Sequence, residues 1–165
     1  MSGIVVWFTG LPASGKTTLA CALRARLDGR PIVLDSDELR VALGAEAYDH
    51  SDRDTFYSVL GRLAAVLAAQ GHVILVAATA SCRAYRDRAR TLSPHFLEVW
   101  VTTPLAECER RDIKGLYARA RAGEATRLPG VGVPFEEPLR AEVIASGGHD
   151  ARALDELVAI LAKPR

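Results

Sequence analysis

The sequence predicts an α/β fold, a three-layer P-loop NTPase-type parallel sheet with helices on both faces and a mobile lid. Three observations predict it. Short apolar runs without polar alternation are typical of parallel strands buried on both faces. Helical patterns alternate with these runs, which places helices over the sheet. A glycine-rich turn joins the first run to the first helical pattern. At 165 residues, the chain is expected to form a single domain, residues 1–165.

The predicted strands are apolar and rich in β-branched residues. They are expected at residues 4–9, 32–34, 73–77 and 96–101, with a last short strand at 143–145. The second strand ends at Asp35, so a carboxylate follows it directly. Because every apolar run is too short to cross a bilayer, no membrane span and no membrane partner are expected.

The predicted helices show apolar residues at helical spacing or begin at capping residues. Leu19, Leu23 and Leu27 recur every four residues, which indicates one buried helix face. Ser51 or Asp52 is expected to cap a long helix that ends before residue 71. The other helices are expected at residues 16–27, 37–43, 83–92, 105–112 and 150–161.

Glycines and prolines accumulate between residues 112 and 137, and the helical pattern weakens there. Such a composition predicts loops and turns. We expect one short helix at residues 117–122 within this stretch. The segment 112–137 is therefore predicted to be the mobile lid.

Charge and cysteine content exclude several classes of protein. The chain has 21 basic and 20 acidic residues, a net charge of +1, so a strongly basic nucleic-acid-binding protein is excluded and no nucleic-acid partner is expected. Its 3 cysteines are scattered without metal-ligand spacing, as expected of reduced thiols in the cytoplasm. The first residues lack a basic segment and a cleavage site, so no signal peptide is expected.

The glycine-rich turn fits the phosphate-binding pattern G-x-x-x-x-G-K-T between a strand and a helix. It consists of Gly10, Leu11, Pro12, Ala13, Ser14, Gly15, Lys16 and Thr17, and Thr18 follows it. The glycines allow backbone amides to face an anion, and the helix N-terminus adds positive potential. Lys16 is expected to reach the β- and γ-phosphates of ATP, and Thr17 to ligate Mg²⁺. A strand–helix turn without a ligand is the alternative, and the pattern arises by chance in roughly one chain of this size in a hundred.

Two carboxylates, Asp35 and Asp37, follow the second strand. The carboxyl ends of parallel strands face the ligand crevice, and the third strand ends without an acidic residue. Asp35 is therefore expected to support Mg²⁺ together with Thr17, and Asp37 to orient or deprotonate an acceptor hydroxyl. The alternative is a turn aspartate followed by a helix cap, both common uses of this residue.

Taken together, these motifs resemble the adenylylsulfate (APS) kinase family. The resemblance runs from Ile4 to about Gly147. It is carried by residues 10–18, 34–40, 52–53, 83–90, 103–112 and 114–123. The last of these stretches is the most family-specific, whereas many small kinases share the first.

The resemblance implies that MgATP donates its γ-phosphate to the 3′-hydroxyl of the APS ribose, giving ADP and 3′-phosphoadenylyl sulfate (PAPS). It places Arg40 and Arg53 on the acceptor's phosphosulfate and ribose, and Tyr48 on its adenine. By the same resemblance, Phe135 is a second aromatic residue of the site, and Lys114 and Leu116 lie in the lid. Without the resemblance, solvated arginines and core aromatics would be the alternative. Relatives in this family commonly pair, so a homodimer is one expectation.

The sequence departs from the family on the acceptor side. Phe56 stands where the family has an asparagine that contacts the acceptor, and Ser58 where it has an arginine. Ala80 replaces a serine that some members phosphorylate. A related enzyme that phosphorylates another nucleotide-linked or small hydroxyl compound is therefore a second hypothesis.

The remaining arginines are assigned by position. Arg110 or Arg111, just before the lid, is expected to contact the nucleotide. The arginines of residues 83–90 are expected to form a solvated helix face. A polynucleotide-type kinase or a non-catalytic nucleotide-binding module are the other functional alternatives, and the retention of Lys16 and Asp37 argues against the latter.

Overall fold

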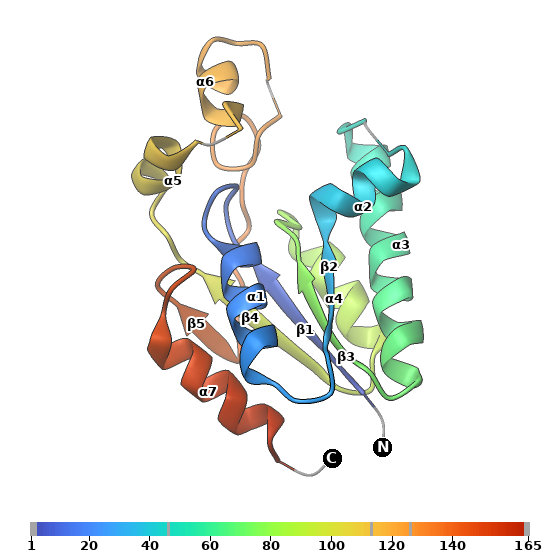
Figure 1. Cartoon of the computed structure of the whole chain (residues 1–165). Coiled ribbons are helices and arrows are strands. Elements are labelled where there is room, and N and C mark those ends of the chain that lie inside the picture. The colour runs from blue at the N-terminus through green and yellow to red at the C-terminus, as the bar shows by residue number, and fades with distance from the viewer. Residues whose placement is uncertain (1–2, 46, 113, 126, 164–165) are drawn as a thin grey trace.

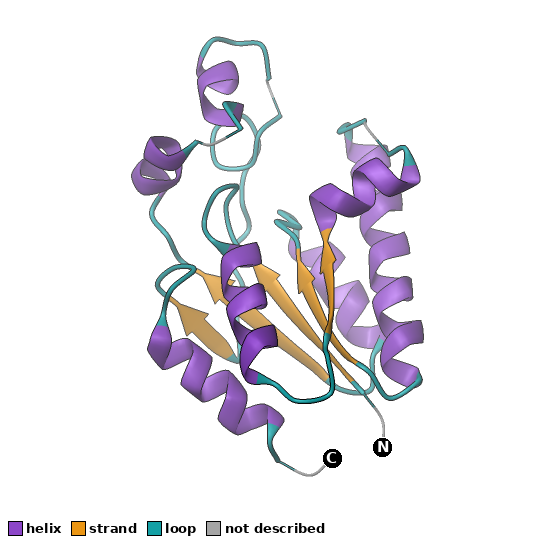
Figure 2. Cartoon of the chain, in the orientation of Figure 1, coloured by secondary structure: helices purple, strands orange, loops and turns teal. Residues whose placement is uncertain are grey.

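The computed structural model describes residues 3–45, 47–112, 114–125 and 127–163. Their strands form one five-stranded sheet in the order β2-β3-β1-β4-β5, and every neighbouring pair is parallel. Helices cover both faces of the sheet (Figures 1 and 2). This architecture confirms the predicted three-layer parallel fold.

All five predicted strands are present. They are β1 (Ile4–Thr9), β2 (Ile32–Asp35), β3 (Val73–Ala77), β4 (Phe96–Val101) and β5 (Val143–Ala145). Every residue of β1 is buried, as its unbroken apolar run predicts. In β2 only Leu34 is buried, because this strand lies at the edge of the sheet. The expectation of a fully buried second strand is therefore wrong.

The helices agree with the predictions to within a few residues. They are α1 (Lys16–Arg26), α2 (Ser36–Leu43), α3 (His50–Ala69), α4 (Arg83–Leu92), α5 (Leu105–Arg111), α6 (Leu116–Arg121) and α7 (Ala151–Leu161). The predicted cap of α3 is wrong. Asp49 is the N-cap, and its carboxylate accepts the backbone N–H of Asp52 at 2.9 Å.

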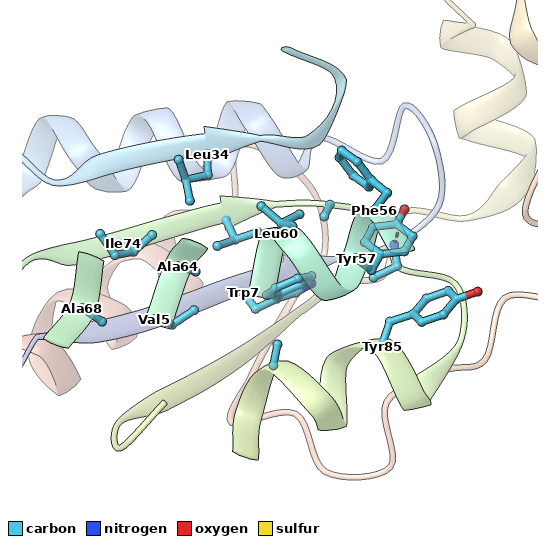
Figure 3. Packing of buried hydrophobic residues seen from close by; sticks show 14 residues of the cluster. Val5, Trp7, Leu34, Phe56, Tyr57, Leu60, Ala64, Ala68, Ile74 and Tyr85 are labelled. Atoms are coloured by element: carbon cyan, nitrogen blue, oxygen red, sulfur yellow. Dashed lines mark hydrogen bonds between the residues drawn. The ribbon is translucent and has the colours of Figure 1, made fainter. Parts of the chain in front are cut away.

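Alternate residues of β1 belong to two separate hydrophobic cores. Val6 and Phe8 face α1 and α7, whereas Val5 and Trp7 pack with residues of α3 and α4 (Figure 3). Both faces of the central strand are thus removed from water, which explains why its sequence does not alternate.

A third, smaller core lies at the carboxyl edge of the sheet. Cys108, Tyr117 and Leu128 are buried together there. Leu11 of the glycine-rich turn packs against them. The turn and the segment 112–137 therefore share a hydrophobic cluster. Figure 1 shows α5 and α6 at the same end of the sheet as that turn.

The arginine-rich face of α4 is not simply solvated. Arg86 is 2% exposed and its Nε donates to Glu98 Oε1 at 2.7 Å. The prediction of a solvated face is wrong for this residue because β4 supplies a buried carboxylate opposite it. Within the part of the chain that the structure describes, no helix is long and apolar enough to cross a membrane.

Candidate active site

The glycine-rich turn between β1 and α1 has a backbone that only glycine permits at two positions. Gly10 has φ 155° and Gly15 has φ 99°. A Cβ on Gly10 would lie 2.6 Å from the Val101 carbonyl oxygen, and one on Gly15 would lie 2.7 Å from the Gly148 nitrogen. The turn is therefore packed tightly against the strand and loop beside it.

Lys16 begins α1 and folds back over this turn. Its Nζ donates to the carbonyl oxygens of Gly10, at 3.2 Å, and Leu11, at 2.8 Å. Burial lowers the pKa of Lys16 to about 8, with Asp37 and Asp35 acting in the opposite direction. An anion bound in the turn would favour the charged ammonium further.

Asp35 connects the turn to α2. Its Oδ2 accepts the Thr17 hydroxyl at 2.5 Å, and its Oδ1 accepts the Asp37 N–H at 2.8 Å as the N-cap of α2. Asp35 rather than Asp37 is therefore the cap of α2, so the alternative that made Asp37 the helix cap is wrong, and the other Asp35 oxygen faces Thr17. A hydroxyl beside a carboxylate suits Mg²⁺, which takes oxygen ligands and keeps waters and substrate phosphates as the others.

Ser14 supplies an observation that fits a phosphate in the turn. It is fully buried, and its Oγ has no hydrogen-bond partner among the described residues. Buried hydroxyls normally have a partner. A phosphate oxygen would provide one.

Asp37 meets the segment 112–137 through an ion pair with Lys114. Its Oδ2 lies 2.5 Å from Lys114 Nζ. The hydrogen bond to Asp37 raises the pKa of Lys114. The structure therefore brings together two residues that the sequence predicted for one site, although they lie on different segments.

An arginine–aromatic cluster lies between α2 and α3. The Arg40 guanidinium carbon is 3.9 Å from the ring centroid of Phe56 and 4.3 Å from that of Tyr48. Arg40 donates to the carbonyls of Ala45 and Ala47, at 3.0 and 3.1 Å. The predicted acceptor residues are thus neighbours, but Arg40 is buried and holds the loop that carries Tyr48.

Arg53 lies beside Tyr48, with its guanidinium carbon 6.0 Å from that ring centroid, whereas Phe135 contacts Arg86 of α4 and an acceptor contact from it stays a prediction. Arg53 is 9% exposed and donates to the carbonyl of Arg127. Phe135 is half-buried, with its ring centroid 5.7 Å from the Arg86 guanidinium. Arg53 therefore connects α3 with the segment 112–137.

Three other predicted residues have local partners. Arg110 and Arg111 both pair with Glu107 on α5, at 2.7 and 2.9 Å. Leu116 packs in the hydrophobic cluster around Cys108. A nucleotide contact from either arginine, and an acceptor contact from Leu116, stay predictions.

Two residues that the sequence did not single out contact the turn directly. Tyr117 Oη donates to the Pro12 carbonyl at 2.8 Å, and Thr103 Oγ1 donates to the Ser14 carbonyl at 2.7 Å. Both lie within stretches that carry the family resemblance. That resemblance was the available signal, but it named no role for them.

Two hollows lined by described residues lie away from the turn. One, of about 350 Å³, is bounded by α2, the loop after it and α3, and the other, of about 510 Å³, lies beside α4 and β4. Neither is lined by residues of the glycine-rich turn. The site is therefore defined by its converging polar groups.

Comparison with known proteins gives a consistent family. The family model described as adenylylsulphate kinase matches residues 2–146. The adenylyl-sulfate kinase of Synechococcus sp. (strain JA-3-3Ab) is 42% identical over 146 residues, which is 86% of this chain and 83% of that protein. The probable bifunctional SAT/APS kinase 2 of Sorangium cellulosum is 40% identical over 99% of this chain, which spans 29% of its length.

Solved structures of APS kinases are also similar to this chain. The Mycobacterium tuberculosis APS kinase CysC in complex with AMPPNP and APS has a TM-score of 0.90 and 36% identity, with 98% of this chain and 99% of that chain covered. A hexameric APS kinase from Thiobacillus denitrificans has a TM-score of 0.62 and 27% identity, and this chain covers 28% of it.

Proposed function

Because the chain belongs to the adenylylsulphate kinase family, we propose that it transfers the γ-phosphate of MgATP to the 3′-hydroxyl of APS, forming PAPS and ADP. One observation carries the proposal beyond family membership. Asp37 lies at the carboxyl edge of the sheet, joined to the phosphate turn through Asp35, which contacts both Asp37 and Thr17. A carboxylate so placed suits an acceptor hydroxyl next to the terminal phosphate.

The donor side works by positioning and charge. The free amides of the turn and the N-terminus of α1 bind the phosphates, and the Ser14 hydroxyl gains an acceptor. Lys16 exchanges its two carbonyl partners for the β- and γ-phosphates, where its charge offsets the charge that develops during transfer. Thr17 and Asp35 would hold Mg²⁺, which when bound would neutralise phosphate charge.

On the acceptor side, Asp37 accepts the hydroxyl proton as the oxygen attacks phosphorus. The carboxylate must first leave its ion pair with Lys114. Lys114 then remains beside the reacting groups, where its ammonium can approach the transferred phosphoryl group. Tyr48, which is half exposed, offers a ring for the adenine of APS, and Arg53 lies beside it.

The test is ADP release coupled to a spectroscopic readout, with purified full-length protein, MgATP and a panel of acceptors. APS, other nucleotide conjugates and sugars form the panel, and PAPS is identified chromatographically. Turnover with APS at ordinary kinase rates supports the proposal. Absence of turnover with APS, while ATP still binds, would contradict it.

One observation favours a second candidate, a kinase of the same type with another nucleotide-linked acceptor. Phe56, at the position of the family's acceptor-contacting asparagine, is 3% exposed and packs against Arg40. It therefore offers the acceptor no hydrogen bond. The same panel decides between the candidates, because a higher kcat/KM for a compound other than APS would favour the second.

The proposal also covers the oligomeric state and the cellular location of the protein. A homodimer follows from the family resemblance, and light scattering on the eluting protein tests it. The three cysteines are free in the structure, as in a reducing compartment such as the cytoplasm. Fractionation of cells that produce the protein tests that location.

A further inference from the structure

Four carbonyl groups of the phosphate turn accept a hydrogen bond from a side chain. Gly10 and Leu11 direct theirs to Lys16 Nζ. Pro12 directs its carbonyl to the Tyr117 hydroxyl, and Ser14 directs its carbonyl to the Thr103 hydroxyl. Carbonyl oxygens repel phosphate, so a turn that binds phosphate must keep them turned away from it.

A planar trans peptide points its carbonyl and its amide in opposite directions. Fixing the Pro12 carbonyl therefore fixes the Ala13 N–H, and fixing the Ser14 carbonyl fixes the Gly15 N–H. In the described part of the chain, neither of these two amides donates to a protein group, whereas the Ser14 N–H between them donates to the Leu11 carbonyl. Both amides are thus available to a ligand, and the carbonyl of each of these two peptides accepts a hydroxyl from outside the turn.

Ala13 shows why such support is needed. It has φ 61°, in the left-handed region that a residue with a Cβ enters at a cost. Surrounding contacts must hold a residue in that conformation. The Tyr117 bond to the preceding carbonyl is one such contact, and the packing of Leu11 in the cluster around Cys108 and Tyr117 is another.

Both hydroxyls are well placed to be rigid. Tyr117 is 2% exposed on α6, within that cluster, and Thr103 is 4% exposed just after β4. Thr103 Oγ1 also lies 3.4 Å from the Ser146 carbonyl. Each hydroxyl therefore belongs to a buried side chain outside the turn.

We propose that Tyr117 and Thr103 are positioning residues for the phosphoryl donor, which turn the Ala13 and Gly15 amides toward the ATP phosphates through their bonds to the Pro12 and Ser14 carbonyls. Neither residue touches the substrate. The inference rests on the proposed function for the identity of the donor. It also couples the segment 112–137 to donor binding, because Tyr117 belongs to that segment.

The experiment measures MgADP binding to the full-length protein by calorimetry, together with steady-state kinetics. Tyr117→Phe keeps the ring and removes only the hydroxyl, and Thr103→Val keeps the shape of its side chain. Each is expected to raise the Kd for MgADP about fivefold, the effect of one neutral hydrogen bond. The KM for ATP rises in parallel, while the KM for APS stays within about twofold of the wild-type value.

Matched control variants remove a tyrosine hydroxyl and a threonine hydroxyl from other parts of the protein. Tyr85→Phe deletes a buried hydroxyl on α4, and Thr91→Val deletes the hydroxyl that donates to the Arg88 carbonyl. Neither changes the Kd for MgADP. Thr103→Ser keeps a hydroxyl and restores binding to within about twofold of wild type, which a purely packing role would not do.

The outcomes separate this inference from the proposed function. If the wild type binds MgADP and both Tyr117→Phe and Thr103→Val bind it equally well, the positioning role is wrong and the proposed function stands. An equal rise in the KM for ATP and for APS also overturns the positioning role, because it indicates a general effect on closure. A wild-type protein that does not bind MgADP overturns both.

Discussion

Lys114 Nζ and Asp37 Oδ2 lie 2.5 Å apart and join the segment 112–137 to the start of α2. Their side chains are 60% and 59% exposed, so water screens the pair and its contribution to stability is small. An ion pair of this kind opens at little cost. Asp37 can therefore exchange the ammonium for an acceptor hydroxyl.

Replacing Asp37 by asparagine removes the proton acceptor and keeps the size of the side chain. We expect Asp37→Asn to lower kcat with APS by about 10²–10⁴-fold, the usual contribution of a positioned general base. Binding of MgADP should change little, because Asp35, not Asp37, contacts Thr17. Steady-state kinetics and calorimetry measure the two effects.

Glu38→Gln is the matched control, since Glu38 is the next, exposed carboxylate on α2. It should retain wild-type kcat. A kcat for Asp37→Asn within about fivefold of wild type would contradict the role of Asp37 as the base.

Lys114→Met tests what the ammonium does once the ion pair has opened. If Lys114 supports the transferred phosphoryl group, its loss lowers kcat about tenfold or more, a typical cost of removing one transition-state donor. If it only held Asp37, the variant would free the carboxylate and kcat would hold or rise. Single-turnover measurements of PAPS formation distinguish these results.

The pKa of Lys16 predicts how nucleotide binding depends on pH. Burial lowers it to about 8, so the ammonium loses its proton in the free protein as the pH rises through that value. Phosphates bind the charged form. The Kd for MgADP should therefore rise about tenfold between pH 7 and pH 9, with proton uptake on binding at the upper end.

The lowered pKa of Lys16 has the opposite effect on the stability of the free protein, which increases with pH while nucleotide binding weakens. Between pH 8 and 10.5 the unfolded chain binds a proton at Lys16 that the folded chain does not, so this group's contribution to stability increases with pH across that window. Calorimetry in buffers of different ionisation enthalpy measures the proton uptake on nucleotide binding. A Kd for MgADP that does not change between pH values of about 7 and 9 would show that Lys16 does not lose its proton in this range.

The parts of the fold that depend on local pattern could be predicted from the sequence. The strands β1, β3 and β4 are largely apolar because helices cover both faces of the sheet, and the glycine-rich turn is a local motif. The cap of α3 could not be chosen, because Asp49, Ser51 and Asp52 all suit a cap and only the chain path selects one. The edge position of β2 depends on strand order, which no local pattern encodes.

The site could be predicted only as far as residue identity determines chemistry. In the sequence, Phe56 predicts the loss of a hydrogen bond to the acceptor. In the fold, its ring also stacks on Arg40 and buries that guanidinium. Tyr117 had no distinguishing signal, because its bond to Pro12 spans 105 positions of the chain. Pairings of this kind arise from packing between elements.

The last prediction concerns two arginines on α4 that form carboxylate pairs of nearly equal length, one buried and one exposed to solvent. Arg86 pairs with Glu98 at 2.7 Å, with side chains 2% and 8% exposed. Arg88 pairs with Asp54 at 2.8 Å, with side chains 39% and 46% exposed. Replacing each arginine by methionine therefore compares a buried pair with a solvated one on the same helix.

Arg86→Met leaves Glu98 buried with only the longer contact to Arg90, and it leaves the Ala80 and Glu136 carbonyls without their guanidinium donor. We expect it to lower the free energy of unfolding by about 3–5 kcal/mol, whereas Arg88→Met should cost at most about 1 kcal/mol. Urea denaturation followed by circular dichroism measures both. Equal losses for the two variants would mean that Glu98 is solvated after the change, and the structural role assigned to Arg86 would be wrong.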